Sequence, residues 1–287
     1  MRVAVVYDVD GWAHHRNALG LRSFQRTIDF TPMTNDYVAE NTASVARSYD
    51  AVLAFTWIAT ADYGLGKKLI SVVSSHSYSI RNDWKECLAR GGGVLCISPR
   101  LHHELRTHGV ESVLCYQGVD DVVFVPDPAR ARGGVRVCGW VGSDLHGDDQ
   151  KGYRTIFENL RSALSPALEF RPLCRNYLNA YTIPEMVEYY RSIDVLLSTS
   201  RLEGGPLPPL EAMACGVPVL TTNVGCMDEV VRHGVDGFVV DRTCAAFTNY
   251  LRQVTPEMGE SARANIEKRW SWRVLTPSWE AAIERFT

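Results

Sequence analysis

Two glutamates, Glu203 and Glu211, stand eight positions apart and enclose the segment EGGPLPPLE. An apolar stretch before them, Asp194–Leu197, predicts a strand, and the residues after the glycines predict a short helix. A helix start presents unpaired backbone N–H groups, so a glycine turn between a strand and a helix favours an anion. Carboxylates do not bind anions, but they accept hydrogen bonds from hydroxyl groups. A nucleotide-sugar offers this layout, with sugar hydroxyls, a diphosphate and ribose hydroxyls in a row.

Short apolar stretches alternate with helical patterns along the chain, which predicts parallel sheets with helices on both faces. We expect an α/β protein with two Rossmann-like domains facing a cleft, at residues 1–127 and 135–269, joined by a Pro-, Gly- and charge-rich linker at 128–134. A helical segment at 270–287 completes the prediction. Ligands of such sheets bind outside the carboxyl ends of the strands. The expected strands are Val3–Tyr7, Ala51–Phe55, Ile70–Ser74, Val94–Ile97, Val113–Tyr116, Val135–Val141, Leu168–Pro172, Val195–Ser198, Val217–Thr221 and Gly237–Val240.

Composition is that of a soluble globular protein, with 287 residues, 46% hydrophobic and 22% charged residues, and a net charge of −3. This charge gives no general attraction to nucleic acid or to an anionic membrane. No apolar run reaches the roughly 18–20 residues of a membrane span, and the N-terminal apolar run is too short for a signal peptide. The eight cysteines show no metal-ligand spacing. We therefore expect a cytoplasmic protein with reduced thiols and no bound metal or cofactor.

Further motifs accompany the two glutamates in both halves of the chain, and together they resemble one known family. The motifs are Lys151-Gly152, Ile183–Leu197, Val217–Val219, Asp236-Gly237, Gln117–Asp120, the VSSHSY segment around His76, and Trp270-Ser271-Trp272. As a set they resemble the retaining glycosyltransferases of the GT-B fold, family 4, also known as glycosyl transferases group 1. The resemblance implies the GT-B fold, with the last helix crossing back to the first domain.

The resemblance also implies roles for the residues of the second half. Glu203 would contact hydroxyl groups of the donor sugar, and Glu211 those of the nucleotide ribose. Lys151 would neutralise the diphosphate as a point charge, although a surface lysine is the alternative. The family usually has an arginine a few residues earlier, where this chain has Ser143, so His146 or a distant arginine would have to replace it. The expected donor-binding residues are Gly204, Gly205, Pro206, Leu207, Glu211, Gly11, Ser143, Arg175 and Asn176, and the expected catalytic residues are His76, Glu203 and Lys151.

In the first half, the resemblance places His76 near the transferred sugar, where a histidine orients a hydroxyl or shares a proton. The alternative is a purely structural histidine. Gly11 matches the family's glycine-rich loop, and the residues around it are expected on the acceptor side: Asp10, His14, His15 and Arg16. Asp8-Val9-Asp10 also spells the Asp-x-Asp motif of metal-dependent glycosyltransferases. We reject a metal role there, because the other elements of that fold are missing.

The sequence thus predicts a retaining, metal-independent glycosyltransferase that moves a sugar from a UDP- or GDP-sugar to a hydroxyl acceptor. The short first half suits a large acceptor, such as a polysaccharide, a lipid or a protein, and peripheral association with a membrane is compatible with it. One alternative is a phage-type enzyme that glycosylates modified DNA bases. Another is a catalytically silent nucleotide-sugar-binding protein, suggested by the missing arginine, and a third is a nucleotide-sugar 2-epimerase.

Overall fold

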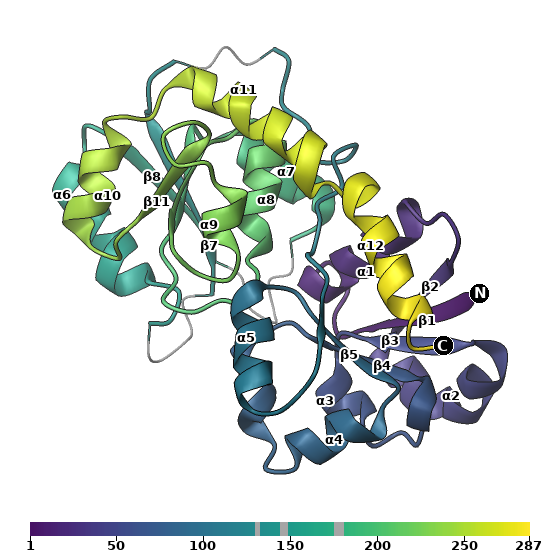
Figure 1. Cartoon of the computed structure of the whole chain (residues 1–287). Helices are drawn as coiled ribbons and strands as arrows, with labels where there is room; N and C mark the ends of the chain where they lie inside the picture. The colour runs from purple at the N-terminus through teal and green to yellow at the C-terminus, as the bar shows by residue number, and fades with distance from the viewer. Residues whose placement is uncertain (130–132, 144–148, 175–180) are drawn as a thin grey trace. The chain divides into compact units, whose positions relative to one another are not determined.

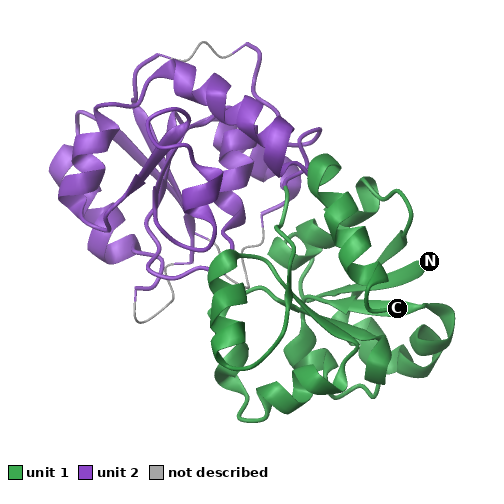
Figure 2. Ribbon diagram, viewed as in Figure 1, with its two compact units in different colours: residues 1–118, 272–287 green, residues 119–271 purple. Residues whose placement is uncertain are grey.

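The computed structural model describes residues 1–129, 133–143, 149–174 and 181–287. The chain forms two compact units, residues 1–118 with 272–287 and residues 119–271 (Figure 2). Each unit contains a parallel sheet with helices packed against its faces (Figure 1). The predicted α/β class with two Rossmann-like units is therefore confirmed.

The first unit is built on a six-stranded sheet with strand order β2-β1-β3-β4-β5-β6. Its interior strands are buried along their length because helices cover both faces. The elements are β1 (Arg2–Tyr7), α1 (Ala13–Ser23), β2 (Asp29–Thr34), α2 (Asn35–Ser48), β3 (Ala51–Ala54), α3 (Trp57–Thr60), η1 (Gly66–Lys68), β4 (Leu69–Val73), η2 (His76–Ile80), α4 (Trp84–Arg90), β5 (Gly93–Cys96), α5 (Pro99–Thr107), β6 (Val113–Leu114) and α12 (Trp272–Glu284).

The second unit is built on a five-stranded sheet with strand order β11-β10-β9-β7-β8. The central strand β9 lies between β10 and β7, so the residues after it are surrounded by loops from both neighbours. The elements are β7 (Val137–Gly142), η3 (Tyr153–Glu158), α6 (Asn159–Leu164), β8 (Glu169–Cys174), α7 (Ile183–Arg191), β9 (Val195–Ser198), α8 (Leu207–Ala214), β10 (Val219–Thr222), α9 (Met227–Val230), β11 (Gly237–Val240), α10 (Cys244–Leu251), α11 (Pro256–Asn265) and η4 (Ile266–Trp270).

The last helix, α12, belongs to the first unit, as predicted. Trp272 and Trp279 are fully buried in the core of that unit. Pro277 lies inside the helix without ending it. A proline has no N–H for the carbonyl four residues earlier, and here Arg26 donates a hydrogen bond of 3.1 Å to that carbonyl, on Arg273. The hydrogen bond from Arg26 thus replaces the one that Pro277 cannot donate, and it links α12 to the rest of the first unit.

Two parts of the fold differ from the sequence prediction. Strand β2 was not predicted, because its sequence DFTPMT contains Pro32 and polar residues. Proline is tolerated there since β2 is an edge strand. Residues 119–127 were placed in the first domain but group with the second unit. The Arg263 guanidinium accounts for this, because it donates to the carbonyls of Asp121 and Phe124 at 2.8 and 2.6 Å.

Candidate active site

The closest contact between predicted site residues joins Lys151 to Glu203. Lys151 Nζ lies 2.5 Å from Glu203 Oε1, and the two side chains are 27% and 14% exposed. Ser200 Oγ donates a hydrogen bond of 2.6 Å to the same carboxylate oxygen. Charge-assisted bonds of this kind fix a side chain more firmly than neutral ones. The contact brings a cation suited to phosphate and an acceptor suited to hydroxyls to one point of the second unit.

The loop that carries Lys151 is fastened to the end of β9. Thr199 Oγ1 donates to the carbonyl of Lys151 at 2.6 Å, and Trp140 Nε1 donates to Thr199 Oγ1 at 3.0 Å. Gly152 has a φ of +74°, and a Cβ there would lie 2.4 Å from the carbonyl oxygen of Thr199. Only glycine fits both the backbone angle and the close approach. The Lys-Gly pair therefore has a structural reason for its glycine.

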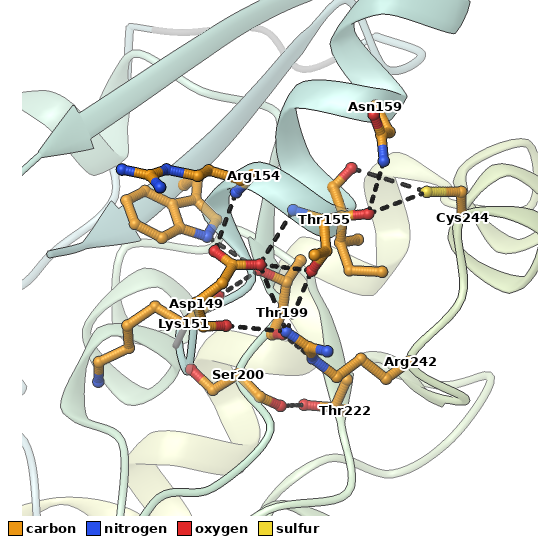
Figure 3. Close-up of polar contacts among 12 residues, drawn as sticks. Asp149, Lys151, Arg154, Thr155, Asn159, Thr199, Ser200, Thr222, Arg242 and Cys244 are labelled. Carbon is orange, nitrogen blue, oxygen red and sulfur yellow. Dashed lines mark hydrogen bonds and ion pairs between the residues drawn. The ribbon is translucent and has the colours of Figure 1, made fainter. Parts of the chain in front are cut away.

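Arg242, which follows β11, holds the same loop in place (Figure 3). Its Nε donates to the carbonyl of Thr199 at 2.9 Å, and a terminal nitrogen donates to the carbonyl of Asp149 at 3.1 Å. Asp149 in turn accepts the amides of Arg154 and Thr155 at 3.0 and 2.9 Å, at the start of η3. Arg242 therefore stabilises the loop that carries Lys151.

Burial and hydrogen bonding act in opposite directions on Asp149. Burial raises the pKa of its carboxyl. The Thr155 hydroxyl and the amides of Arg154 and Thr155 lower this pKa by more, and the charge of Arg242 also lowers it, to a smaller extent. The net pKa lies below the usual value. Asp149 is thus held as a carboxylate that caps the start of η3.

Glu211 lies inside α8 and is 1% exposed. The Tyr190 hydroxyl donates to its Oε2 at 2.7 Å. A buried carboxylate is costly unless it is hydrogen-bonded, so Tyr190 is a necessary partner. The predicted contact of Glu211 with a ribose stays a prediction.

The glycine turn after Glu203 leads directly into α8, as predicted. Pro206 is the N-cap residue of α8, and no side chain caps this helix start. Two of the first helical residues are prolines and lack an N–H, so the amide of Leu207 is the main backbone donor there. Gly225, after β10, packs against this turn, because a Cβ there would lie 2.8 Å from the carbonyl oxygen of Gly204.

Ser143 directly follows β7, at the carboxyl edge of the second sheet. Arg175 and Asn176 lie outside the described residues, as does His146, a proposed replacement for the missing arginine. The roles of Gly205 and Pro206 in donor binding also stay predictions.

In the first unit, His76 pairs with a carboxylate from α5. His76 Nδ1 lies 2.6 Å from Glu104 Oε2, and the two side chains are 14% and 37% exposed. Burial and a hydrogen bond to Glu104 raise the pKa of the Tyr78 hydroxyl far above its usual value. Glu104 thus contacts both His76 and Tyr78. A carboxylate at Nδ1 places the proton on that nitrogen and orients the ring.

The loop after β1 places two predicted acceptor-side residues together. Gly11 has a φ of +76°, and its amide donates to His15 Nδ1 at 2.8 Å. His15 Nδ1 also lies 3.7 Å from Asp10 Oδ1, which accepts the Tyr7 hydroxyl at 2.9 Å. Burial, the largest effect, lowers the pKa of His15. His15 is therefore held neutral, with its proton on Nε2.

His14 takes a different set of partners. Its Nε2 lies 3.0 Å from Ser74 Oγ, and its Nδ1 lies 3.3 Å from Asp8 Oδ2. Arg16, also predicted on the acceptor side, is 8% exposed within α1. Asp8 and Asp10 thus contact different histidines. Within the described residues, no group of three or more His, Cys, Asp or Glu is arranged to hold a metal ion.

None of the helices in the described part of the chain has the length and apolarity that a membrane crossing requires. The eight cysteines, all within the described residues, form no disulfide with one another, and six of them are buried.

Comparison with known proteins gives the class of protein first. Residues 178–269 match the family model described as glycosyl transferases group 1. HepE of Anabaena, solved in complex with UDP and glucose, aligns with a TM-score of 0.71 at 15% identity. The alignment covers 99% of this chain and 100% of the HepE chain. Sucrose-phosphate synthase of Thermosynechococcus elongatus has a TM-score of 0.68 at 14% identity, covering 99% and 98%. The chain therefore has the GT-B fold, and the predicted resemblance to glycosyl transferases group 1 is confirmed.

A sequence relative shares only a short segment with this chain. A D-inositol 3-phosphate glycosyltransferase of Thermobispora bispora is 43% identical over 58 residues, which cover 20% of this chain. The aligned part spans only 14% of the length of that relative. The sequence similarity to this relative is therefore limited to a short segment, whereas HepE and sucrose-phosphate synthase share the fold of nearly the whole chain.

No role was predicted for several residues that build the site. Thr199 and Ser200 directly follow β9, where the strand-end rule expects ligands, but nothing in their types indicated a role, and Arg242, which follows β11, was not indicated. Gly225 follows β10 and has a positive φ of 59°, which the sequence alone does not reveal. Glu104 is separated from His76 by 28 residues and carries no local signal.

Proposed function

We propose that this chain is a retaining, metal-independent glycosyltransferase that moves a sugar from a UDP- or GDP-sugar to a hydroxyl acceptor. The contact of Lys151 with Glu203, next to the turn that opens α8, carries the proposal. A diphosphate needs a cation and backbone donors, and a sugar needs a carboxylate within reach of the same point. The second unit offers these groups on two loops that are hydrogen-bonded to each other.

On this proposal, Lys151 stabilises the negative charge that grows on the diphosphate as the sugar leaves. A fixed cation acts at the transition state without reorganisation, so it accelerates the reaction and does more than hold the donor. Glu203 accepts hydroxyl hydrogen bonds from the sugar, and Ser200 keeps its carboxylate in position. Glu211 would reach a ribose hydroxyl with the carboxylate that Tyr190 also contacts.

The first unit would receive the acceptor. His76, oriented by Glu104, supplies a ring nitrogen for a hydroxyl group. Retention of configuration requires no enzyme nucleophile if the leaving diphosphate itself takes the acceptor proton on the face where the acceptor enters. Lys151 supplies the positive charge that a divalent cation provides in metal-dependent transferases, and we therefore propose that no metal is required.

A donor screen tests the proposal without knowledge of the acceptor. The melting temperature would be measured with UDP-, GDP-, ADP- and TDP-sugars, because a ligand of the folded state raises stability by about 2.7 kcal/mol at 100 times its dissociation constant. The donor that binds would then be incubated with the protein and EDTA, and the release of free nucleotide measured. We expect a UDP- or GDP-sugar to bind and to be turned over slowly with water as acceptor.

The control compares two lysines of the second unit. Lys151→Met should abolish nucleotide release, whereas Lys268→Met, at an exposed lysine of η4, should leave it unchanged. Donor binding without release of nucleotide, with water or with any hydroxyl acceptor, would contradict the proposed activity and favour a silent binding protein. Inversion at the anomeric carbon, followed by NMR of the first product, would overturn retention alone.

A further inference from the structure

Three side chains at the carboxyl edge of the first sheet form a row of polar contacts, and one of them, His14, is also expected on the acceptor side. Ser74 Oγ lies 3.0 Å from His14 Nε2, and His14 Nδ1 lies 3.3 Å from Asp8 Oδ2. A serine, a histidine and a carboxylate in this order have the connectivity of an activated nucleophile, its base and the group that orients the base. The contact of His14 Nδ1 with Asp8 is close but not aligned as a hydrogen bond. Hydrogen bonds of catalytic groups are often long or poorly aligned before a substrate binds, so the contact is compatible with this connectivity.

The fold brings these residues together from separate strands. Asp8 follows β1 and Ser74 follows β4, and β3 lies between these two strands in the sheet. Strands separated by one neighbour are roughly 10 Å apart. His14, near the start of α1, bridges this distance, and its ring stacks on Phe55 at the end of β3, with ring centroids 5.6 Å apart. The His14 ring therefore contacts one residue after each of three neighbouring parallel strands.

The contacts also set the positions of the protons. Asp8 beside Nδ1 favours a proton on that nitrogen, which leaves the lone pair of Nε2 directed at Ser74 Oγ. Burial raises the pKa of Asp8. Its interaction with His14 lowers the pKa by more than this, so the net pKa lies below the usual value. The neighbouring His15 has the opposite arrangement, because its Nδ1 accepts the Gly11 amide. Only His14 of these two faces a serine hydroxyl as a base.

Ser74 is not the serine that caps the following helical turn. The cap of η2 is Ser75, whose Oγ accepts the amide of Ser77. The His14 and Asp8 side chains are 24% and 39% exposed, and Ser74 is half-buried, so a small molecule can reach the row. The hydroxyl of Ser74 is thus engaged with His14 in a place open to a ligand.

We propose that Ser74 is a nucleophile activated by His14, and that the first unit hydrolyses small activated carboxylic esters through an acyl-serine. Ser74 Oγ forms a bond with the carbonyl carbon of the ester, and the bond from that carbon to the leaving oxygen breaks. The serine proton passes to His14 Nε2 and then to the leaving oxygen. Water repeats the exchange and releases the carboxylic acid. This activity is separate from the proposed glycosyl transfer, and neither depends on the other.

The first experiment uses p-nitrophenyl acetate as substrate and a fluorophosphonate as covalent probe, with mass spectrometry of the labelled peptide. We expect labelling at Ser74 that is lost in Ser74→Ala and kept in the control Ser75→Ala. Loss of a general base costs about 100-fold or more, so His14→Gln should reduce both rates by that factor. The control His103→Gln, at an exposed histidine of α5, should leave both rates unchanged. Labelling at another residue, or equal effects of the two histidine variants, would overturn the proposal.

A second experiment measures activation of the side chain without requiring ester turnover. Ser74→Cys and Ser75→Cys would be alkylated with iodoacetamide at pH 7, and the rate at each position followed by mass spectrometry. A histidine partner favours the thiolate, so we expect Ser74→Cys to react about tenfold faster than Ser75→Cys. His14→Gln in the Ser74→Cys background should remove the difference. Equal rates at the two positions, in variants with unchanged melting temperature, would overturn the role of His14.

Discussion

The two units place different chemistry at the carboxyl edges of similar parallel sheets. In the second unit, a lysine and a glutamate touch at 2.5 Å, and hydrogen bonds to main-chain groups fasten the lysine loop. In the first unit, His14 and His76 each pair with a carboxylate at Nδ1. A lysine–glutamate pair offers fixed charge, whereas an imidazole exchanges protons near neutral pH. One sheet edge is therefore suited to holding a charged ligand and the other to handling protons.

The way in which the groups are held differs as well. Thr199, Asp149 and Arg242 engage main-chain carbonyls or amides around Lys151, so the loop conformation itself is fixed. His14 contacts the side chains of Ser74 and Asp8, and His76 contacts the side chain of Glu104. Substitutions in the second unit should thus change both binding and stability, whereas those in the first should change proton transfer with little loss of stability.

After Lys151→Met, the largest effect should come from Glu203→Gln, which keeps the size of the side chain and removes its charge. We expect nucleotide release to fall about 100- to 1000-fold, in the range found for the loss of one transition-state contact. Glu260→Gln, at an exposed glutamate of α11, is the matched control and should have no effect. Steady-state kinetics with the bound donor would measure both, and equal activity of the two variants would remove Glu203 from the site.

Gly152→Ala should strongly destabilise the second unit. Its φ of +74° and the 2.4 Å approach to the Thr199 carbonyl add a steric clash to backbone strain, for a cost of about 2–4 kcal/mol. Gly234→Ala separates the two effects, because Gly234 has a φ of +79° with nothing within 4 Å of its Cβ position. It should cost only about 1–2 kcal/mol. Urea denaturation measures both, and equal losses would show that the close approach contributes nothing.

Tyr190→Phe should destabilise the second unit by about 1.5–3 kcal/mol, because it removes a hydrogen bond to the buried carboxylate of Glu211. Tyr250→Phe is the control, since its ring packs on Phe238 with centroids 4.8 Å apart and that packing is retained. Comparison of the denaturation midpoints gives the difference. A neutral Tyr190→Phe would indicate that Glu211 does not depend on this hydroxyl.

Asp149→Asn should have the smallest effect, about 1 kcal/mol at pH 7, as for the loss of a helix cap. The pKa of Asp149 is lowered on folding from its usual 3.8, so its contribution to stability is present above that value and is lost as the pH falls below it. The difference between wild type and variant should therefore shrink towards pH 3. Thermal melts at pH 7 and pH 3 test this, and a difference that grows at low pH would contradict the sign.

The sequence predicted the second unit in more detail than the first. Glu203 and Glu211 lie in one short segment, so a local pattern was sufficient to indicate them, and the resemblance to a known family indicated Lys151. Ser74, which contacts His14, and Glu104, which contacts His76, are 60 and 28 residues away in the sequence, and no local pattern records such contacts. Strand β2 was missed for a similar reason, because its place at the sheet edge, which permits Pro32, is a property of the assembled sheet.

The docking of α12 on the first unit also affects how the protein is made. Residues 1–118 lack Trp272, Trp279 and Ile283, which are buried in the core they share. During synthesis these residues leave the ribosome only after the whole of 119–271, so the first unit to begin is the last that can be completed. A fragment that stops at residue 118 should expose apolar surface and aggregate, and addition of a peptide covering 272–287 should restore its solubility.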